Sequence, residues 1–309
     1  MTRDEFSKIL EKSNIKERQY DLIKSIDASD ENDQINYQFL SEIGYRQCTV
    51  LGLDLYGYSK FELDKQTLIP FVFDLIYQKT MKDIGTYEGC FFDEYSFPDN
   101  FISTGDGCFQ IFQNPIQAVL FNIYFFITMH TYNASRYYPK FYNYVGELFF
   151  RSCITTGKIF SYEKNHYGPA IITNARILSK DRLNRFLIDA DTYKWFLSKI
   201  DGVENISEIT VEELLEILGI NSALGGCSAI FRTNETFNTG PANKFGREYC
   251  KVKSCHVQKI GDISAKADIF SIYNLELQIY FYIFNPEKKD IGRGMVVSIG
   301  NSNNSGITD

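Results

Sequence analysis

Two aspartates in the N-terminal half of the chain each follow an apolar run and lie beside a glycine. Asp54 ends the run "VLGLD", which continues into "LYGYS", and Asp106 stands between two glycines in "FISTGDGCFQIF". If the two runs are neighbouring strands, both carboxylates meet at one edge of a sheet. Two carboxylates held that close repel each other, and a bound divalent cation relieves the repulsion. The sequence therefore predicts a metal pair made of Asp54 and Asp106.

The available ligands favour Mg²⁺ or Mn²⁺ over zinc. The pair offers only oxygen atoms, and the three histidines, at positions 130, 166 and 256, are scattered along the chain. Each acid also has a simpler interpretation, with Asp54 as a strand terminator and Asp106 as a residue of the common turn sequence "GDG". The matching contexts of the two acids favour the metal site.

The turn after Asp54 is suited to phosphate oxygens. Four backbone N–H groups would line it, those of Leu55, Tyr56, Gly57 and Tyr58. Gly57 would let this backbone approach a ligand closely. Two metal ions beside such a turn suit phosphoryl or nucleotidyl transfer. One ion lowers the pKa of an attacking hydroxyl, and the other neutralises a triphosphate leaving group.

The elements that must position these residues follow from apolar periodicity and turn signals. Strands are predicted at 46–55, 100–104, 108–112, 147–160 and 185–189, and helices at 60–83, 115–134, 168–181 and 190–200. The runs before and after Asp106 form a hairpin with this residue at its tip. Pro70 is expected to kink or break the first helix, and residues 84–99 read as a long loop. This order predicts an α+β fold, with helices packed on a mostly antiparallel sheet.

Composition narrows the class of protein. The chain has 309 residues and a formal net charge of −7, which argues against nucleic-acid binding. Its seven cysteines include no C-x-x-C pair, and the start "MTRDEFSKILEK" is not a signal peptide, so we expect a reduced, cytoplasmic protein. The longest apolar segments are too short to span a bilayer, so no direct membrane insertion is expected.

Four segments, taken in order, resemble those of class III nucleotidyl cyclases. "LGLDLYGYS" resembles their first metal-binding segment, and "FISTGDGCFQIF" their hairpin with the second metal aspartate. "RSCITTGKIFSYEKNHYGPAIITNARIL" resembles their strand, loop and helix with the catalytic arginine, and "NRFLID" the next strand, whose arginine contacts the triphosphate. Four motifs in this order, over roughly residues 46–200, are specific where one would be weak. Within the class, the Gly-Pro-Ala helix and the Arg-led strand ending in Asp are most similar to bacterial Pycsar pyrimidine cyclases.

The resemblance implies a ferredoxin-like βαββαβ core and places the cyclase catalytic domain at residues 41–200. Residues 1–40 are polar and are expected to form an N-terminal helical arm. Residues 201–309 would form a C-terminal extension, with a helix at 205–220, that completes or flanks the sheet. The tail from about residue 300 is predicted to be disordered.

The resemblance also implies roles for single residues. Asp54 and Asp106 match the two metal acids, which hold two Mg²⁺ or Mn²⁺ ions per site. Arg176 matches the arginine that stabilises charge on the pentavalent phosphate, and Arg185 matches the triphosphate contact. Family members are homodimers with active sites across the interface, so the metal acids of one chain would face Arg176 of the other. Alternatively, Arg176 is a surface arginine, Arg185 pairs with a nearby acid, and Arg151, which begins a strand, supports the site or only the fold.

The chain departs from the family at residues that read the base. Adenylate cyclases have a lysine four residues before the second metal aspartate, where this chain has Ile102, which cannot donate to a base. Asn165 matches their second base reader, an aspartate, and its amide can both donate and accept. Tyr56 stands where smaller residues are common and would narrow the base pocket against purines. These departures fit a pyrimidine, although Asn165 could be a plain loop residue and Tyr56 a core residue.

A further departure lies beside the catalytic arginine. The family usually has an asparagine four residues before it, on the same helix face, and this chain has Ile172 there. Asn174 is only two residues before Arg176 and points elsewhere on a regular helix. Either the orienting asparagine is dispensable in this chain, or the helix start is displaced.

Together, these inferences predict a homodimeric enzyme that converts UTP or CTP to the 3′,5′-cyclic monophosphate and pyrophosphate. By resemblance, the product would be a second messenger in bacterial antiphage defence, and a separate effector protein would read it. Two alternatives stay open. The first is an adenylate or guanylate cyclase with atypical base readers, and the second is a degenerate homologue that binds nucleotide or a partner without turnover.

Overall fold

A computed structural model of the chain describes eleven stretches of it. They are residues 45–84, 100–135, 137–162, 165–183, 185–197, 208–209, 237–238, 248–265, 268–285, 290–300 and 306–307. The predicted arm at 1–40, most of the predicted loop at 84–99 and most of the predicted helix at 205–220 lie outside the described residues.

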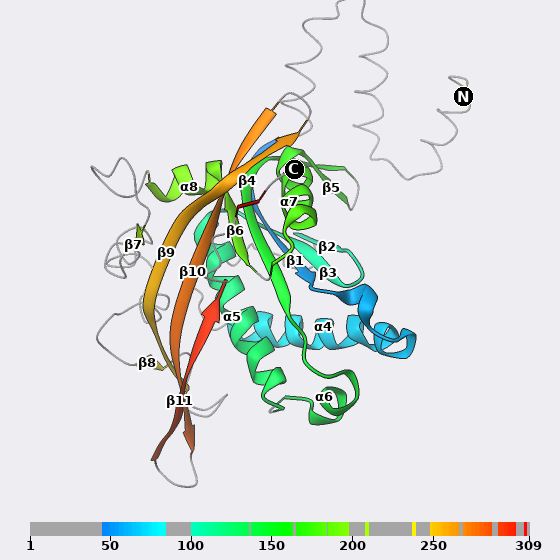
Figure 1. The fold of residues 1–309 in the computed structure, drawn as a ribbon, viewed down its shortest axis with the longest axis vertical. Coiled ribbons are helices and arrows are strands. Elements are labelled where there is room, and N and C mark those ends of the chain that lie inside the picture. Colours follow the sequence, from blue (N-terminus) through cyan, green and yellow to red (C-terminus); the bar gives the residue numbers. More distant parts are fainter. Residues whose placement is uncertain are drawn as a thin grey trace, which may run out of the picture.

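The core of the fold has the order β-α-β-β-α-β. Its elements are β1 (Arg46–Leu55), α4 (Leu63–Ile84), β2 (Phe101–Ser103), β3 (Gly107–Phe112), α5 (Pro115–Asn133) and β4 (Phe150–Tyr162) (Figure 1). β1 pairs antiparallel with both β3 and β4, and β2 pairs antiparallel with β3. The resulting strand order, β2-β3-β1-β4, is that of a ferredoxin-like sheet. The predicted α+β class and βαββαβ core are therefore confirmed.

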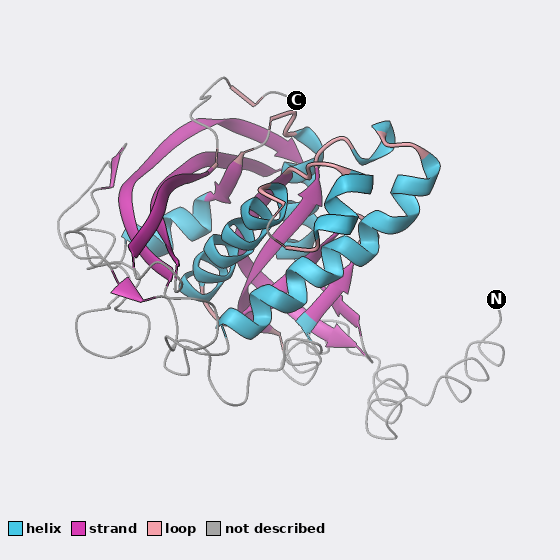
Figure 2. Cartoon of the chain, turned by 90° about the horizontal axis from the view of Figure 1, so that it is seen from below, coloured by secondary structure: helices cyan, strands magenta, loops and turns pink. Residues whose placement is uncertain are grey.

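The same sheet extends past β4. The remaining elements are η1 (Tyr58–Lys60), α6 (Pro139–Val145), β5 (Asn165–Tyr167), α7 (Pro169–Lys180), β6 (Phe186–Asp189), α8 (Ala190–Leu197), β7 (Glu208–Ile209), β8 (Phe237–Asn238), β9 (Glu248–Ala265), β10 (Asp268–Asn285) and β11 (Asp290–Ile299). β6 is parallel to β4, and β10 lies between β6 and β9, antiparallel to both. At this edge the long strands β9 and β10 curve strongly, while helices lie against the flatter part of the sheet (Figure 2). β7 lies inside the segment predicted as a helix at 205–220, so that prediction is wrong for these two residues.

Helices cover both faces of the central strands, and the side chains of β1 alternate between them. Leu51, Leu53 and Leu55 join the main apolar core, to which α4 and α5 contribute most of the helical side chains. Val50 belongs to a smaller cluster on the face covered by α7. Because strand residues alternate with a period of two, Asp54 lies on this α7 face.

The kink or break expected at Pro70 does not divide α4, which runs as one helix through this residue. Proline has no N–H, so the carbonyl of Gln66, four residues earlier, loses its usual helical donor. The hydroxyl of Tyr58 donates to that carbonyl at 3.0 Å. The turn that follows Asp54 thus supplies a replacement bond and is tied to α4.

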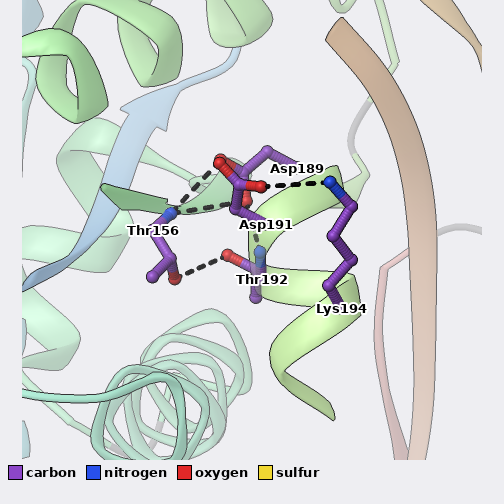
Figure 3. A network of polar contacts seen from close by, with 5 residues as sticks. All are labelled: Thr156, Asp189, Asp191, Thr192 and Lys194. Carbon is purple, nitrogen blue, oxygen red and sulfur yellow. Dashed lines mark hydrogen bonds and ion pairs between the residues drawn. The ribbon is translucent and has the colours of Figure 1, made fainter. Parts of the chain in front are cut away.

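Asp189 connects the end of β6 to α8. Its Oδ1 accepts a hydrogen bond from the backbone N–H of Thr192 at 2.8 Å, as expected for an N-cap. Its two oxygens also accept from the backbone N–H of Thr156 on β4, at 3.3 and 3.2 Å (Figure 3). Asp189 is therefore the residue that caps the start of α8.

Near the C-terminus, the backbone N–H of Ile307 donates to the carbonyl of Ile260 on β9 at 3.2 Å, and its side chain is buried. This contact lies where the sequence predicts a disordered tail. Among the helices of the described stretches, none combines the length and the hydropathy needed to cross a membrane.

Candidate functional site

Asp54 and Asp106 lie at the same end of two neighbouring strands. Asp54 on β1 is paired with Gly107 on β3, and Asp106 directly precedes Gly107. The turn between β2 and β3 contains Gly105 at φ +96°, a left-handed conformation that favours glycine. The structure therefore has the adjoining strands and the hairpin tip that the sequence predicts, and it brings the two acids together.

The electrostatics of the pair agree with mutual repulsion. Burial raises the pKa of the Asp106 carboxyl, and the neighbouring charge of Asp54 raises it further, while Arg151 lowers it. Both acids are partly exposed, and their oxygen atoms suit a hard divalent cation. Within the described stretches, no group of three or more His, Cys, Asp or Glu side chains could hold a metal. A divalent ion at this pair would therefore complete its coordination with water or substrate oxygens.

Arg151, which the sequence leaves between two interpretations, contacts the candidate metal acid. It is paired with Asp54 across β4 and β1, and its Nε donates to Asp54 Oδ2 at 2.6 Å. Its Nη1 donates to the backbone carbonyl of Asp181, just after α7. An arginine at the start of a buried strand indicates that an acidic partner lies nearby. The register between β4 and β1, which identifies this partner as Asp54, is visible only in the structure.

The turn after Asp54 differs in part from the expectation that its four N–H groups face a ligand. The N–H of Tyr56 donates to the carbonyl of Phe149 at 2.8 Å, so it is not available to phosphate. Leu55 is the last residue of β1 and lies opposite Phe150 of β4, with its side chain buried. Gly57, at φ +76°, begins the 3₁₀ turn η1, and its N–H and that of Tyr58 precede the first hydrogen bond of that turn.

The ring of Tyr56 is 41% exposed, so its interpretation as a core residue is wrong. The Nζ atom of Lys60 lies 5.8 Å from the ring centroid. The aromatic ring therefore stands at the surface beside the strand end that carries Asp54, where a ligand could contact it.

Helix α7 places Asn174 and Arg176 on opposite faces. Asn174 is buried against the sheet, and its Nδ2 donates to the carbonyls of Val50 and Cys153, each at 2.9 Å. Gly52 makes room for it, because a Cβ at this position would lie 2.1 Å from Asn174 Oδ1. Arg176, two residues along the helix, points away from the sheet and is partly exposed.

Ile172 shares the outer face with Arg176, because residues four apart lie one above the other on a helix. Its side chain is 52% exposed. The structure thus agrees with the expectation that Asn174 faces elsewhere.

Arg185 forms a buried ion pair. It is 2% exposed, and its Nε and Nη2 atoms lie 2.9 and 2.8 Å from Asp181 Oδ1. This is the acid pairing that the sequence offers as an alternative to the triphosphate contact. A phosphate contact would require the pair to open.

Asn165 lies away from the two acids, whereas Ile102 belongs to the same hairpin as Asp106. Asn165 is exposed at the start of β5 and is paired with Tyr162, the last residue of β4, whereas Asp54 is paired near the first. The 13 residues of β4 span roughly 40 Å at about 3.3 Å per residue. Ile102 is half-buried on β2, against a small apolar cluster that includes Ile111. Within one chain, the structure does not bring Asn165 to the aspartate pair.

No family model matches this chain, and no curated protein matches it. Among solved structures, the guanylyl cyclase Cya2 is similar over 75% of this chain and 92% of that one, at 13% identity and a TM-score of 0.39. The adenylyl cyclase CyaB from P. aeruginosa is similar over 75% and 94%, at 14% identity and a TM-score of 0.40. Adenylate cyclases from Trypanosoma brucei are similar over 74% and 87%, at 13% identity and a TM-score of 0.41. With identities and TM-scores this low, the activity has to be argued from this chain's own residues.

Proposed function

We propose that the protein is a metal-dependent nucleotidyl cyclase, which converts a nucleoside triphosphate to its 3′,5′-cyclic monophosphate and pyrophosphate. The observation that carries the proposal is the pairing of Asp54 and Asp106 at one end of β1 and β3, beside the turn at Gly57. The four segments that resemble class III cyclases support it, because they fall on β1, the β2–β3 hairpin, the unit from β4 to α7, and β6.

Each residue of the site has a role in this reaction. Asp54 and Asp106 would hold two Mg²⁺ or Mn²⁺ ions, which when bound activate the 3′ hydroxyl and offset the charge of the triphosphate. The N–H groups of Gly57 and Tyr58 bind phosphate oxygens. Arg176 stabilises the negative charge that develops on the reacting phosphate.

The positions of these groups in one chain support a homodimer. Asn165, the proposed base reader, lies at the far end of β4 from its own Asp54, and Arg176 faces away from the sheet surface that carries Asp54. A second copy, related by a two-fold axis, can present Asn165 and Arg176 to the acids of the first. Two equivalent sites result, each built from both chains.

The proposed substrate is UTP or CTP. Ile102 has no donor for a base, the amide of Asn165 can pair with a pyrimidine edge, and the exposed ring of Tyr56 is free to limit the size of the base. By the resemblance to Pycsar cyclases, the cyclic nucleotide would act in the cytoplasm as an antiphage signal, read by a separate effector protein.

A panel of nucleoside triphosphates tests the proposal. The full-length protein is incubated with UTP, CTP, ATP or GTP and Mn²⁺, and the products are separated by chromatography. Cyclic UMP or cyclic CMP is expected, and replacing both Asp54 and Asp106 with Asn should abolish it without altering the size of the dimer. If the double variant still makes cyclic nucleotide, the metal assignment is wrong.

The same panel decides between the alternatives. Cyclic AMP or cyclic GMP as the main product would favour a purine cyclase with atypical base readers. The exposed Ile172, in place of the orienting asparagine, favours a degenerate homologue. In that case all four triphosphates should remain uncyclised although nucleotide still binds.

A further inference from the structure

A continuous set of polar contacts joins the candidate metal pair to the end of α7. Asp106 lies beside Asp54, and Asp54 Oδ2 accepts the Nε of Arg151 at 2.6 Å. The same guanidinium donates through Nη1 to the carbonyl of Asp181, the residue that follows the last residue of α7. The carboxylate of Asp181 is in turn held by Arg185.

The two ends of this set differ in burial. Asp54 and Arg151 have side chains that are 25% and 21% exposed, whereas those of Asp181 and Arg185 are 1% and 2% exposed. Asp181 Oδ1 also accepts the backbone N–H of Leu183 at 3.2 Å, which closes the chain after α7 into a fixed turn. A rigid, buried anchor therefore holds one side of Arg151, while its other side holds an acid that solvent can reach.

A guanidinium held on two sides has little freedom to rotate, because its donors lie in a planar fork. Oδ2 of Asp54 accepts a hydrogen bond from this guanidinium, which fixes the orientation of the carboxylate. Its Oδ1 is then the oxygen that remains to bind an ion. Residues that hydrogen-bond to a metal ligand in this way set its orientation, and their loss typically weakens metal binding about 10- to 100-fold.

We propose that Arg151 is a positioning residue that orients the metal-binding carboxylate of Asp54, and that the buried Asp181–Arg185 pair holds Arg151 in place. This inference rests on the proposed metal site. It assigns Arg185 a task that needs no contact with substrate, in place of the triphosphate contact. It also explains why an ion pair is buried at this point, although such pairs contribute little to stability by themselves.

Metal binding without nucleotide tests the proposal. Mn²⁺ affinity of the full-length chain is measured by isothermal titration calorimetry for the wild type and for Arg151→Lys, which keeps the charge of the site but loses the planar fork. Arg46→Lys is the matched control, because Arg46 lies at the other end of β1 and its Nη2 donates to Asn100 Oδ1 at 2.9 Å. Arg151→Lys should raise the Mn²⁺ dissociation constant about 10-fold or more, and Arg46→Lys should leave it unchanged.

Arg185→Lys separates positioning from phosphate contact, with inorganic tripolyphosphate as the probe in metal-free buffer. It should weaken Mn²⁺ binding and leave tripolyphosphate binding unchanged. The opposite result would show that Arg185 contacts phosphate and would overturn its assignment here. Since this variant leaves Arg151 in place, it also carries the test if Arg151→Lys does not fold, as judged by circular dichroism.

Asp54→Asn distinguishes failure of this inference from failure of the metal site. If Asp54→Asn binds Mn²⁺ as tightly as the wild type, the proposed metal site is wrong. If Asp54→Asn loses Mn²⁺ binding while the folded Arg151→Lys variant keeps the wild-type dissociation constant, only the positioning role of Arg151 is overturned.

Discussion

Two inactive variants should restore activity when they are combined in one dimer. Asn174, on the inner face of α7, contacts the backbone of β1 at Val50, and Asp54 lies on the same face of that strand. Arg176 is on the outer face of the helix, so the helix, about 10 Å in diameter, stands between it and the acid of its own chain. An arginine placed this way can serve the acids of another copy. One chain with Asp54→Asn and one with Arg176→Ala would then share one intact site.

The size of the effect follows from counting sites. A heterodimer of the two variants has one site in which both residues are replaced and one in which both are natural. Random exchange of an equal mixture makes about half of the dimers mixed, so about one quarter of the wild-type sites are recovered. A heterodimer purified through two different affinity tags should show about half of the wild-type kcat, with an unchanged KM.

The assay measures cyclic nucleotide formed by each variant alone, by the mixture, and by the purified heterodimer. Arg182→Ala serves as a control, because Arg182 is exposed just beyond α7 and should be active by itself. An inactive heterodimer, with mixed tags demonstrated, would refute the reasoning, because Arg176 would then serve the acids of its own chain. Full activity of Arg176→Ala alone would remove the arginine from the mechanism.

Three further predictions concern stability. Gly52→Ala would place a Cβ 2.1 Å from Asn174 Oδ1, so urea denaturation should show a loss of about 1–3 kcal/mol, part of which Asn174→Ala should restore. Tyr58→Phe removes the donor to the carbonyl of Gln66 and should cost about 1 kcal/mol in the same assay. Burial raises the pKa of Asp189 to about 6, above its unfolded value, so the folded state holds this proton more tightly. The free energy of unfolding should therefore fall, by up to about 3 kcal/mol, as pH rises from about 4 to 6.5, and Asp189→Asn should lack this decline in denaturation curves measured across that range.

Local signals in the sequence were sufficient for the parts of the fold that depend on near neighbours. The hairpin with Asp106 at its tip follows from two apolar runs around a glycine turn, and the structure pairs β2 with β3. The start of α7 at Pro169, within the helix predicted at 168–181, is likewise set by a few adjacent residues. In each case the residues that determine the conformation are adjacent in the chain, so the sequence alone is enough to predict it.

Contacts between distant segments were beyond such signals. The helix-breaking tendency of Pro70 is overcome because Tyr58, twelve positions earlier, supplies the missing donor. Arg185 reads equally well as a phosphate ligand or as an acid partner. Asp181 is only four positions earlier, but the turn after α7 that brings the two side chains together is visible only in the structure. A tyrosine that follows an apolar strand is expected to be a core residue, but the side chain of Tyr56 is exposed.

The alternation of β1 explains why an apolar strand ends in an acid. On the face toward α4 and α5, the leucines at 51, 53 and 55 remain buried to the end of the strand. On the α7 face, the series Val50, Gly52, Asp54 changes from apolar contact, to a gap filled by Asn174, to a carboxylate held by Arg151. Because the three leucines keep β1 packed in the core, the face toward α7 can carry a charged group without disrupting that packing. Helix α7 packs on this second face at Gly52, and Arg151 links Asp54 to the carbonyl of Asp181, directly after the helix. The placement of the acid and that of the helix carrying Arg176 are therefore set by the same few contacts.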